Sequence, residues 1–132
     1  MDNHIYLLKM DLVTCAKYSD LNGVKDCLEA GADIHEGNDD ALMWASVYGN
    51  IEMITYLLEN GANINAQNDY ALRVAAYHGH LDAVKLLLSN GANIEADGNG
   101  ALRLARMYKR QNVVDFLRNY NTITRIKSAR NN

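Results

Sequence analysis

The chain has no proline among its 132 residues, and it has only two cysteines, one tryptophan and one phenylalanine. Without proline, helices cannot start on the residue whose fixed φ suits the first turn, so good helix formers such as alanine must replace it. No run of 18 or more apolar residues occurs, which excludes a membrane-spanning helix. The start, Met1–Ile5, lacks the basic segment of a secretory signal. We therefore expect a cytoplasmic protein.

Signals for chemistry are equally scarce. The four histidines have no paired cysteines and no helical i, i+4 partner, so we predict no metal site. The stretch Asp97-Gly-Asn-Gly100 lacks the later glutamate and the ligand count of a calcium loop. No phosphate-cradling glycine loop precedes a lysine. We predict neither an enzyme nor a bound cofactor. Cys15 and Cys27 fit buried apolar positions in a reducing compartment, with a disulfide or a reactive thiol as the alternative.

What the chain does contain is a 30-residue repeat. Asn60-Gly-Ala-Asn-Ile64 returns as Asn90-Gly-Ala-Asn-Ile94, and Gly31-Ala-Asp-Ile34 lies one period upstream. Self-similarity at a fixed period of this length is typical of a solenoid, whose function lies on its surface. Four apolar columns recur at the same offset: Leu12, Leu42, Leu72 and Leu102; Cys15, Ala45, Ala75 and Ala105; Val24, Ile54, Val84 and Val114; Cys27, Leu57, Leu87 and Leu117.

Each unit has the pattern of two short helices. In the third unit, small apolar residues at 72, 75 and 76 precede a break at Gly79-His80, and larger ones at 81, 84, 87 and 88 follow it. Glycine at positions 61 and 91 should end the second helix, because it takes the left-handed C′ conformation without a Cβ penalty. One column of acidic or amide residues predicts the N-caps of the first helices: Asp39, Asp69 and Asn99.

The segment Tyr70–Ile94 resembles an ankyrin repeat almost throughout, with the pair Ala75-Ala76, Gly79-His80, the leucine run 86–88 and Gly91-Ala92. The resemblance covers residues 10 to 123 and implies an all-α ankyrin-repeat solenoid of stacked helix-turn-helix units with short hairpin loops. The chain departs from the family in its period, which is 30 and not the usual 33, so we expect blunt loops in place of β-hairpin fingers. This 30-residue, proline-free form is similar to ankyrin repeats of giant DNA viruses.

A second departure concerns the bonds between units. The family's Thr-Pro-Leu-His is Tyr70-Ala-Leu-Arg73 in the third unit. Losing the threonine and the histidine removes the side-chain bond that ties neighbouring repeats in the family. Capping of the helices therefore falls to the column of Asp39, Asp69 and Asn99.

By this resemblance we divide the chain into an N-terminal helical cap or lead-in (1–9), four repeats (10–37, 38–67, 68–97 and 98–123) and a basic tail (124–132). Ile5, Leu8, Leu12 and Cys15 have helical spacing and predict a long first helix from residue 2 or 3, or else a leftover second helix of an upstream repeat. The tail should be frayed or a short helical extension. Polar residues replace interface residues in the fourth repeat, as a C-terminal cap needs: Arg106, Gln111 and Arg118.

The ankyrin architecture also implies a binding surface. In the family, the two residues before the Gly-His turn and the hairpin tips face a concave groove. Tyrosine and methionine are frequent here at these positions and are enriched at protein interfaces, although tyrosines could instead only seal the inter-helix turns. Trp44 should pack against the next repeat. The predicted partner-binding residues are Tyr18, Val47, Tyr48, Tyr70, Tyr77, His78, Met107 and Tyr108.

Charge is divided along the chain. Residues 1–100 hold five Lys or Arg against fifteen Asp or Glu, whereas residues 101–132 hold eight against Asp115 alone. Such a basic segment can engage nucleic acid, anionic lipid or an acidic protein, or it can be a solvated cap whose cations suit helix C-termini. The candidate polyanion-binding residues are Arg103, Arg106, Lys109, Arg110 and Arg118.

We predict a monomeric, non-catalytic module that binds a protein partner through its concave surface and does not bind a membrane. The resemblance to viral and bacterial effector ankyrins implies a host protein as that partner, bound in the host cytoplasm. The alternative is binding of a polyanion or nucleic acid through the basic C-terminal repeat. The family also implies that Asn65, in the shortened hairpin, is a target for asparagine hydroxylation.

Overall fold

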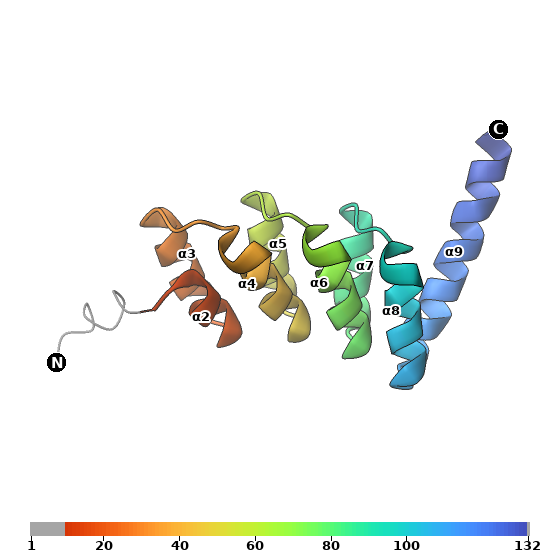
Figure 1. The fold of residues 1–132 in the computed structure, drawn as a ribbon, viewed down its shortest axis with the longest axis horizontal. Coiled ribbons are helices and arrows are strands. Elements are labelled where there is room, and N and C mark those ends of the chain that lie inside the picture. The colour runs from red at the N-terminus through yellow and green to blue at the C-terminus, as the bar shows by residue number, and fades with distance from the viewer. Residues whose placement is uncertain (1–9, 132) are drawn as a thin grey trace.

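The computed structural model describes residues 10–131, and within this part the chain forms eight helices and no β-strand. They stack as pairs, with the first helices in one layer and the second helices in another (Figure 1). The predicted all-α solenoid of stacked helix pairs is therefore confirmed. The first helices are α2 (Leu12–Lys17), α4 (Glu36–Val47), α6 (Ala66–Tyr77) and α8 (Ala96–Met107), and the second helices are α3 (Leu21–Glu29), α5 (Ile51–Glu59), α7 (Leu81–Ser89) and α9 (Gln111–Asn131).

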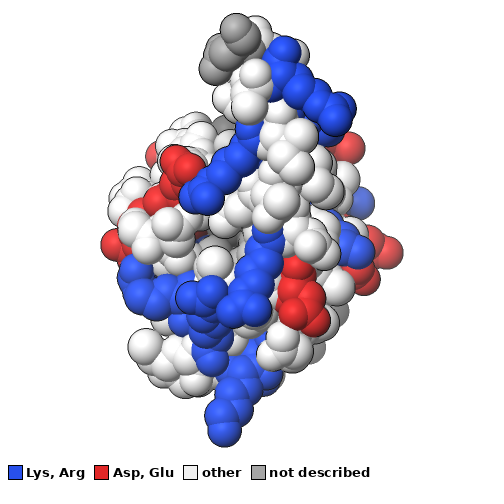
Figure 2. Space-filling view, turned by 90° about the vertical axis from the view of Figure 1, so that its right-hand side faces the viewer, with Lys and Arg blue, Asp and Glu red and all other residues white. Residues whose placement is uncertain are grey.

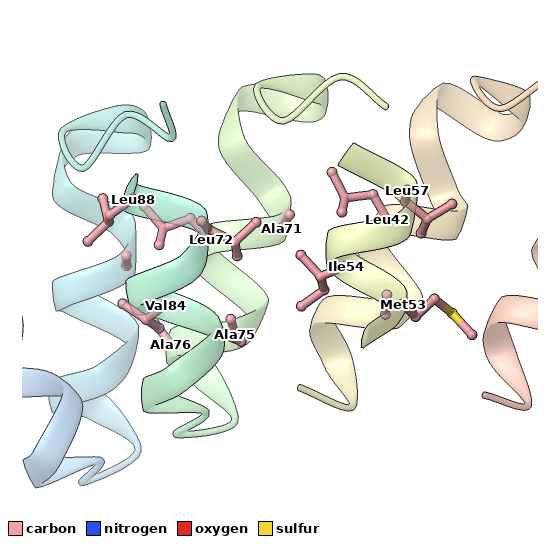
Figure 3. Packing of buried hydrophobic residues seen from close by; sticks show 14 of the residues in the cluster. Leu42, Met53, Ile54, Leu57, Ala71, Leu72, Ala75, Ala76, Val84 and Leu88 are labelled. Carbon is pink, nitrogen blue, oxygen red and sulfur yellow. The ribbon is translucent and has the colours of Figure 1, made fainter. Parts of the chain in front are cut away.

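The hydrophobic core follows the predicted columns. Small residues such as Ala45, Ala75 and Ala105 are fully buried where the first helices meet. Larger buried residues such as Ile54 and Leu87 lie on the second helices, and Figure 3 shows how the two kinds interdigitate. Because alanine allows close approach, the first helices pack against one another more closely than the second helices do. Stacking thus buries apolar faces that no single pair of helices could cover.

Glycine ends the second helices as predicted. Gly61 has a φ of 94°, and its N–H donates to the carbonyl of Leu58 at 3.2 Å. The N–H of Ala62 donates to the carbonyl of Leu57 at 3.0 Å, which completes a Schellman motif. Asn121 replaces glycine in this column, and α9 continues through it to residue 131. Of the two alternatives for the tail, the structure therefore has the helical extension.

The predicted N-caps of the first helices are wrong. An N-cap residue needs extended backbone, but Asp39, Asp69 and Asn99 have φ values of 65°, 57° and 60°. Each is the last of three consecutive left-handed residues, at 37–39, 67–69 and 97–99. Asp, Asn and Gly tolerate this conformation best, and they occupy eight of these nine positions, the exception being Gln67. The N-cap residues whose side chains do accept a backbone N–H are Asp11, Asp20 and Asn50.

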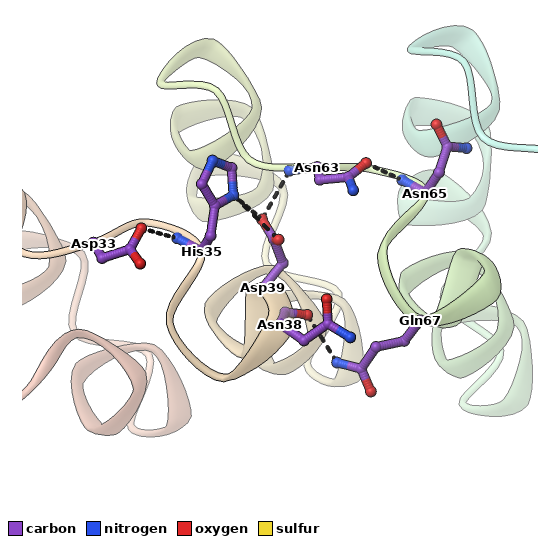
Figure 4. Close-up of polar contacts among 7 residues, drawn as sticks. All are labelled: Asp33, His35, Asn38, Asp39, Asn63, Asn65 and Gln67. Carbon is purple, nitrogen blue, oxygen red and sulfur yellow. Dashed lines mark hydrogen bonds and ion pairs between the residues drawn. The ribbon is translucent and has the colours of Figure 1, made fainter.

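Asp39 and Asp69 instead hold the start of a first helix to the loop that follows the second helix of the same unit. The N–H of Asn63 donates to the buried carboxylate of Asp39 at 2.8 Å, and Nδ1 of His35 lies 3.1 Å from the same carboxylate (Figure 4). One unit further, the N–H of Asn93 donates to the carboxylate of Asp69 at 2.6 Å. The carboxylates of Asp39 and Asp69 therefore bond backbone N–H groups of these loops and do not cap the first helices.

The long N-terminal helix is not found in the described residues either. α2 begins at Leu12, since Asp11 has extended backbone (φ −82°, ψ 170°) and accepts the N–H of Thr14 at 2.7 Å. A left-handed residue, Ser19 (φ 58°), then separates α2 from α3. The first helix therefore ends before Gly23, which is the first glycine of the chain. The helical cap that we expect at residues 1–9 lies outside the described residues.

Candidate functional site

Large apolar side chains are exposed mainly along one edge of the stack. At this edge each first helix turns into its second helix, on the side of the molecule opposite the left-handed turns (Figure 1). Seven large hydrophobic side chains are exposed in the described part, and four of them lie on this edge: Tyr18 (69% exposed), Tyr48 (48%), Met107 (63%) and Tyr108 (43%). Together with half-buried neighbours they form what we call the aromatic edge: Tyr18, Tyr48, Tyr77, His78, Met107 and Tyr108.

Ring contacts hold the C-terminal half of the aromatic edge in place. The ring of Tyr77 lies 4.3 Å from that of Tyr108 in the next unit and 4.7 Å from that of His78, centroid to centroid. A hydrogen bond with Tyr77 raises the pKa of Tyr108. Burial, assisted by the nearby charges of His80 and Arg110, lowers the pKa of His78 and favours the neutral imidazole. Rings fixed in this way lose little conformational freedom when a partner covers them.

The N-terminal half of the edge has a second aromatic pair. Trp44 is half-buried, and its ring stacks on that of Tyr48 at 6.1 Å. The ammonium group of Lys17, from the preceding unit, lies 5.5 Å from the centroid of the Trp44 ring. This cation–π contact links the first two units beneath the exposed tyrosine.

The turns behind the edge are held by long side chains. Nε2 of His80 donates to the carbonyl of Val47 in the preceding unit at 2.8 Å. The histidine of the Gly-His turn therefore holds the end of α4. One unit further, Nε of Arg110 donates to the carbonyl of Tyr77 at 2.9 Å. Both bonds satisfy a carbonyl in the last turn of a first helix, where no intrahelical N–H is available.

The structure does not bring Tyr70 to the same edge. Tyr70 follows the left-handed turn at the start of α6, seven residues and therefore roughly 10 Å from Tyr77 along the helix. Its half-buried ring lies under the guanidinium group of Arg73, at 4.8 Å. Val47 is half-buried in the last turn of α4, beside the edge. The predicted partner-binding set therefore divides into the aromatic edge with Val47, and Tyr70 apart from it.

Basic side chains gather at the C-terminal end of the stack, where Figure 2 shows few acidic ones. Two of the five candidate arginines and lysines are engaged in internal bonds. Arg103 donates to the carbonyls of Asp97 and Gly98 at 3.0 Å and to the Asp97 carboxylate at 3.1 Å. Arg110 bonds the carbonyl of Tyr77, as described above. The other three candidates are exposed, and they are Arg106, Lys109 and Arg118.

Residues 10–131 contain no group of three or more His, Cys, Asp or Glu side chains that could hold a metal ion. No helix in the same part is long and apolar enough to cross a membrane. Cys15 is buried, and burial together with the neighbouring Cys27 raises the pKa of its thiol to about 12. Cys27 is half-buried and donates to the carbonyl of Met10 at 3.3 Å, and both thiols are free.

One family matches the sequence across nearly all of the described helices. The family model, described as ankyrin repeats in three copies, matches residues 12–97 and 65–127. The chain belongs to the ankyrin-repeat family. Ankyrin repeats are generally protein–protein interaction modules, and the family is typically non-catalytic. No curated protein matches this sequence.

On the loop side of this ankyrin stack, arginine side chains bond the carbonyls of the left-handed turns, which the sequence did not lead us to predict. Arg73 donates to the carbonyls of Gln67 and Asn68 at 2.9 and 3.1 Å. Its guanidinium group also lies 3.5 Å from the carboxylate of Asp97, in the left-handed turn at the start of α8. The guanidinium group presents several donors in one fork, so Arg73 can bond both carbonyls from the helix that follows the turn. The only signal in the sequence is that arginine follows the turn at positions 73 and 103.

Proposed function

We propose that this ankyrin protein binds another protein through its aromatic edge. The observation that supports the proposal is the concentration of exposed Tyr and Met side chains along one edge of the stack. Isolated exposed apolar residues are ordinary, but a contiguous row of them is typical of an interface. The row also consists of the residue types that protein interfaces favour, held by ring–ring contacts.

The proposal includes a monomeric adaptor, decoy or competitor in the cytoplasm of a host cell. It rests on the 30-residue, proline-free repeat, which is similar to ankyrin repeats of giant DNA viruses. We also retain the proposed repeat boundaries before residues 38, 68 and 98. Their support is that each falls inside a left-handed turn. The boundary at residue 124 has no such support, since α9 passes through it.

A binding experiment tests the role of the aromatic edge. The partner is first captured with the wild-type protein and identified by mass spectrometry, and its affinity is then measured for Tyr48→Ala and Tyr108→Ala. We expect each substitution to weaken binding by about 2 kcal/mol or more, as for anchor residues at the centre of an interface. The unfolding midpoint should change little, because roughly half of each ring is already exposed.

Lys85→Ala is the control, since Lys85 is exposed on the second-helix layer. It should leave the affinity unchanged and lower the stability by no more than about 1 kcal/mol, since Lys85 loses only its contact with the ring of Phe116 at 5.4 Å. Tyrosine variants that bind as well as the parent would show that the tyrosines only seal the inter-helix turns. Tyrosine variants that unfold would lead to the same conclusion.

The second candidate function is binding of a polyanion or nucleic acid at the basic end, including Arg106, Lys109 and Arg118. It is favoured by the gathering of basic side chains in Figure 2. Fluorescence anisotropy with labelled duplex DNA and RNA tests it. Binding that persists at physiological salt and weakens steeply as salt rises would support this candidate, because phosphate contacts release counterions. Absence of binding at physiological salt would leave capping as the role of these residues.

A further inference from the structure

A groove opens between α8 and α9 at the C-terminal end of the stack. Its volume is about 710 Å³, and it combines basic, amide and aliphatic side chains. The side chains that matter for its chemistry are Leu102, Arg103, Arg106 and Met107 from α8, and Asn121 and Arg125 from α9.

Two arginines of the groove have their charge available. Arg103 is held by Asp97, so its guanidinium group is fixed and partly neutralised. Arg106 and Arg125 are both exposed, and neither guanidinium group has a hydrogen-bond or ion-pair partner among residues 10–131. They come from different helices and line one groove. Exposed guanidinium groups placed in this way favour carboxylate or phosphate, which they bind in a bidentate manner.

The lining of the groove favours carboxylates of a protein over nucleic acid. No aromatic ring lines the groove, so a base entering it would have nothing to stack on. Its apolar part is aliphatic, from Leu102 and Met107. The rest of the chain is acidic, and the net charge of the protein is −3, so a long polyanion would be repelled outside the groove. A short acidic peptide segment would meet only the local positive charge.

The groove is also continuous with the aromatic edge. Met107 belongs to both, and Tyr108 follows it directly. A protein that covers the C-terminal half of the aromatic edge therefore reaches the groove without a gap.

We propose that the groove between α8 and α9 binds the carboxylates of an acidic segment of the protein partner, while apolar side chains of that partner lie on the aromatic edge. This inference rests on the proposed function and adds the chemical character and the orientation of the partner. The acidic segment lies toward the C-terminal end of the ankyrin stack, because Arg106 and Arg125 are found only there.

Short labelled peptides test the groove without knowledge of the partner. Two probes are used, a peptide of glutamates alone and the same peptide with tyrosines among the glutamates, and a short DNA duplex is the comparison. We expect both peptides to bind at low salt and the tyrosine-containing peptide to bind more tightly. The double variant Arg106→Gln and Arg125→Gln should bind both peptides about tenfold or more less tightly, since charge-assisted bonds to carboxylate are lost.

The matched control is the pair Lys25→Gln and Lys85→Gln. It also removes two positive charges, but from the second helices, where each lysine lies over an aromatic ring. This pair should change the peptide affinity by less than about twofold. Thermal unfolding of both double variants shows that each remains folded. Equal weakening by the two pairs would overturn the inference, because it would show a response to net charge alone.

The remaining outcomes separate the groove from the aromatic edge. If no acidic peptide binds, or if the duplex binds and the peptides do not, the groove inference falls and protein binding at the edge is unaffected. If Arg106→Gln and Arg125→Gln leave the peptides bound while Tyr108→Ala weakens the tyrosine-containing peptide, only the edge is supported. If the arginine variants weaken binding and Tyr108→Ala does not, the groove stands and the role of the edge falls.

Discussion

The bond between Asp69 and the N–H of Asn93 gives a sharp test of what holds the start of α6 to the loop between α7 and α8. The carboxylate of Asp69 is 4% exposed and accepts the N–H of Asn93 at 2.6 Å, and the side-chain amide of Asn65 donates to both its oxygens at 3.1 Å. Asp69→Ala removes every one of these bonds. It leaves the part-buried N–H of Asn93 without an acceptor in the loop between α7 and α8.

The expected loss of unfolding free energy in Asp69→Ala has two parts. A charged acceptor contributes about 1.5–3 kcal/mol to a hydrogen bond of this kind, and leaving the donor unsatisfied falls in the same range. Alanine at a φ of 57° adds about 1 kcal/mol of backbone strain. Asn99→Ala is the matched control: Asn99 has a φ of 60° in the same column but is exposed and makes no side-chain capping bond. It should therefore cost only the backbone part.

Urea denaturation followed by circular dichroism gives the free energy of unfolding of both variants. The difference between them measures what the bonds of Asp69 contribute. We expect Asp69→Ala to cost about 1.5–3 kcal/mol more than Asn99→Ala. Asp69→Asn should lie between wild type and alanine, because an amide oxygen can still accept the Asn93 N–H while the charge is lost. A cost for Asp69→Ala equal to or below that of Asn99→Ala would refute the bonds of the Asp69 carboxylate as a source of stability.

Three further predictions concern stability and thiol chemistry. Leu72→Ala should lower the free energy of unfolding by ~2–5 kcal/mol through lost burial and a cavity, whereas exposed Arg118→Ala should change it by less than about 0.5 kcal/mol; near-equal denaturation midpoints would mean that the columns are misaligned. Gly61→Ala should cost about 1–2 kcal/mol in the same assay, all of it from the backbone, since a Cβ there meets no atom within 4 Å; an alanine variant as stable as wild type would contradict the left-handed C′ assignment. Cys27 should react with a thiol reagent in the native state and Cys15 only after unfolding, and rapid native labelling of Cys15 would disprove its burial. Because folding raises the pKa of Cys15 from 9.0 to about 12, the stability that this thiol contributes is complete below pH 9 and is lost as the pH rises through that window.

Several features followed from the sequence because they depend on residues close together in the chain. Apolar residues one helical turn apart form one stripe on a helix, and that stripe recurs every 30 residues. A stripe that recurs at a fixed period predicts stacked units. Glycine at positions 61 and 91 ends a helix wherever that helix lies, because the left-handed C′ conformation is a local property. The row of tyrosines was visible for the same reason: it repeats with the unit.

Tertiary structure alone decided which partner each polar side chain chose. Asp39 could have capped its own helix, but it bonds an N–H 24 residues away, which the loop after α5 brings within 2.8 Å. Arg103 was predicted to be available for a polyanion, yet the folded loop places Asp97 and two carbonyls within its reach. A hydrogen-bonding side chain selects among all groups nearby in space, and its sequence neighbours are only some of them. The helical columns were therefore readable from the chain, whereas the bonds between units and the groove between α8 and α9 required the fold.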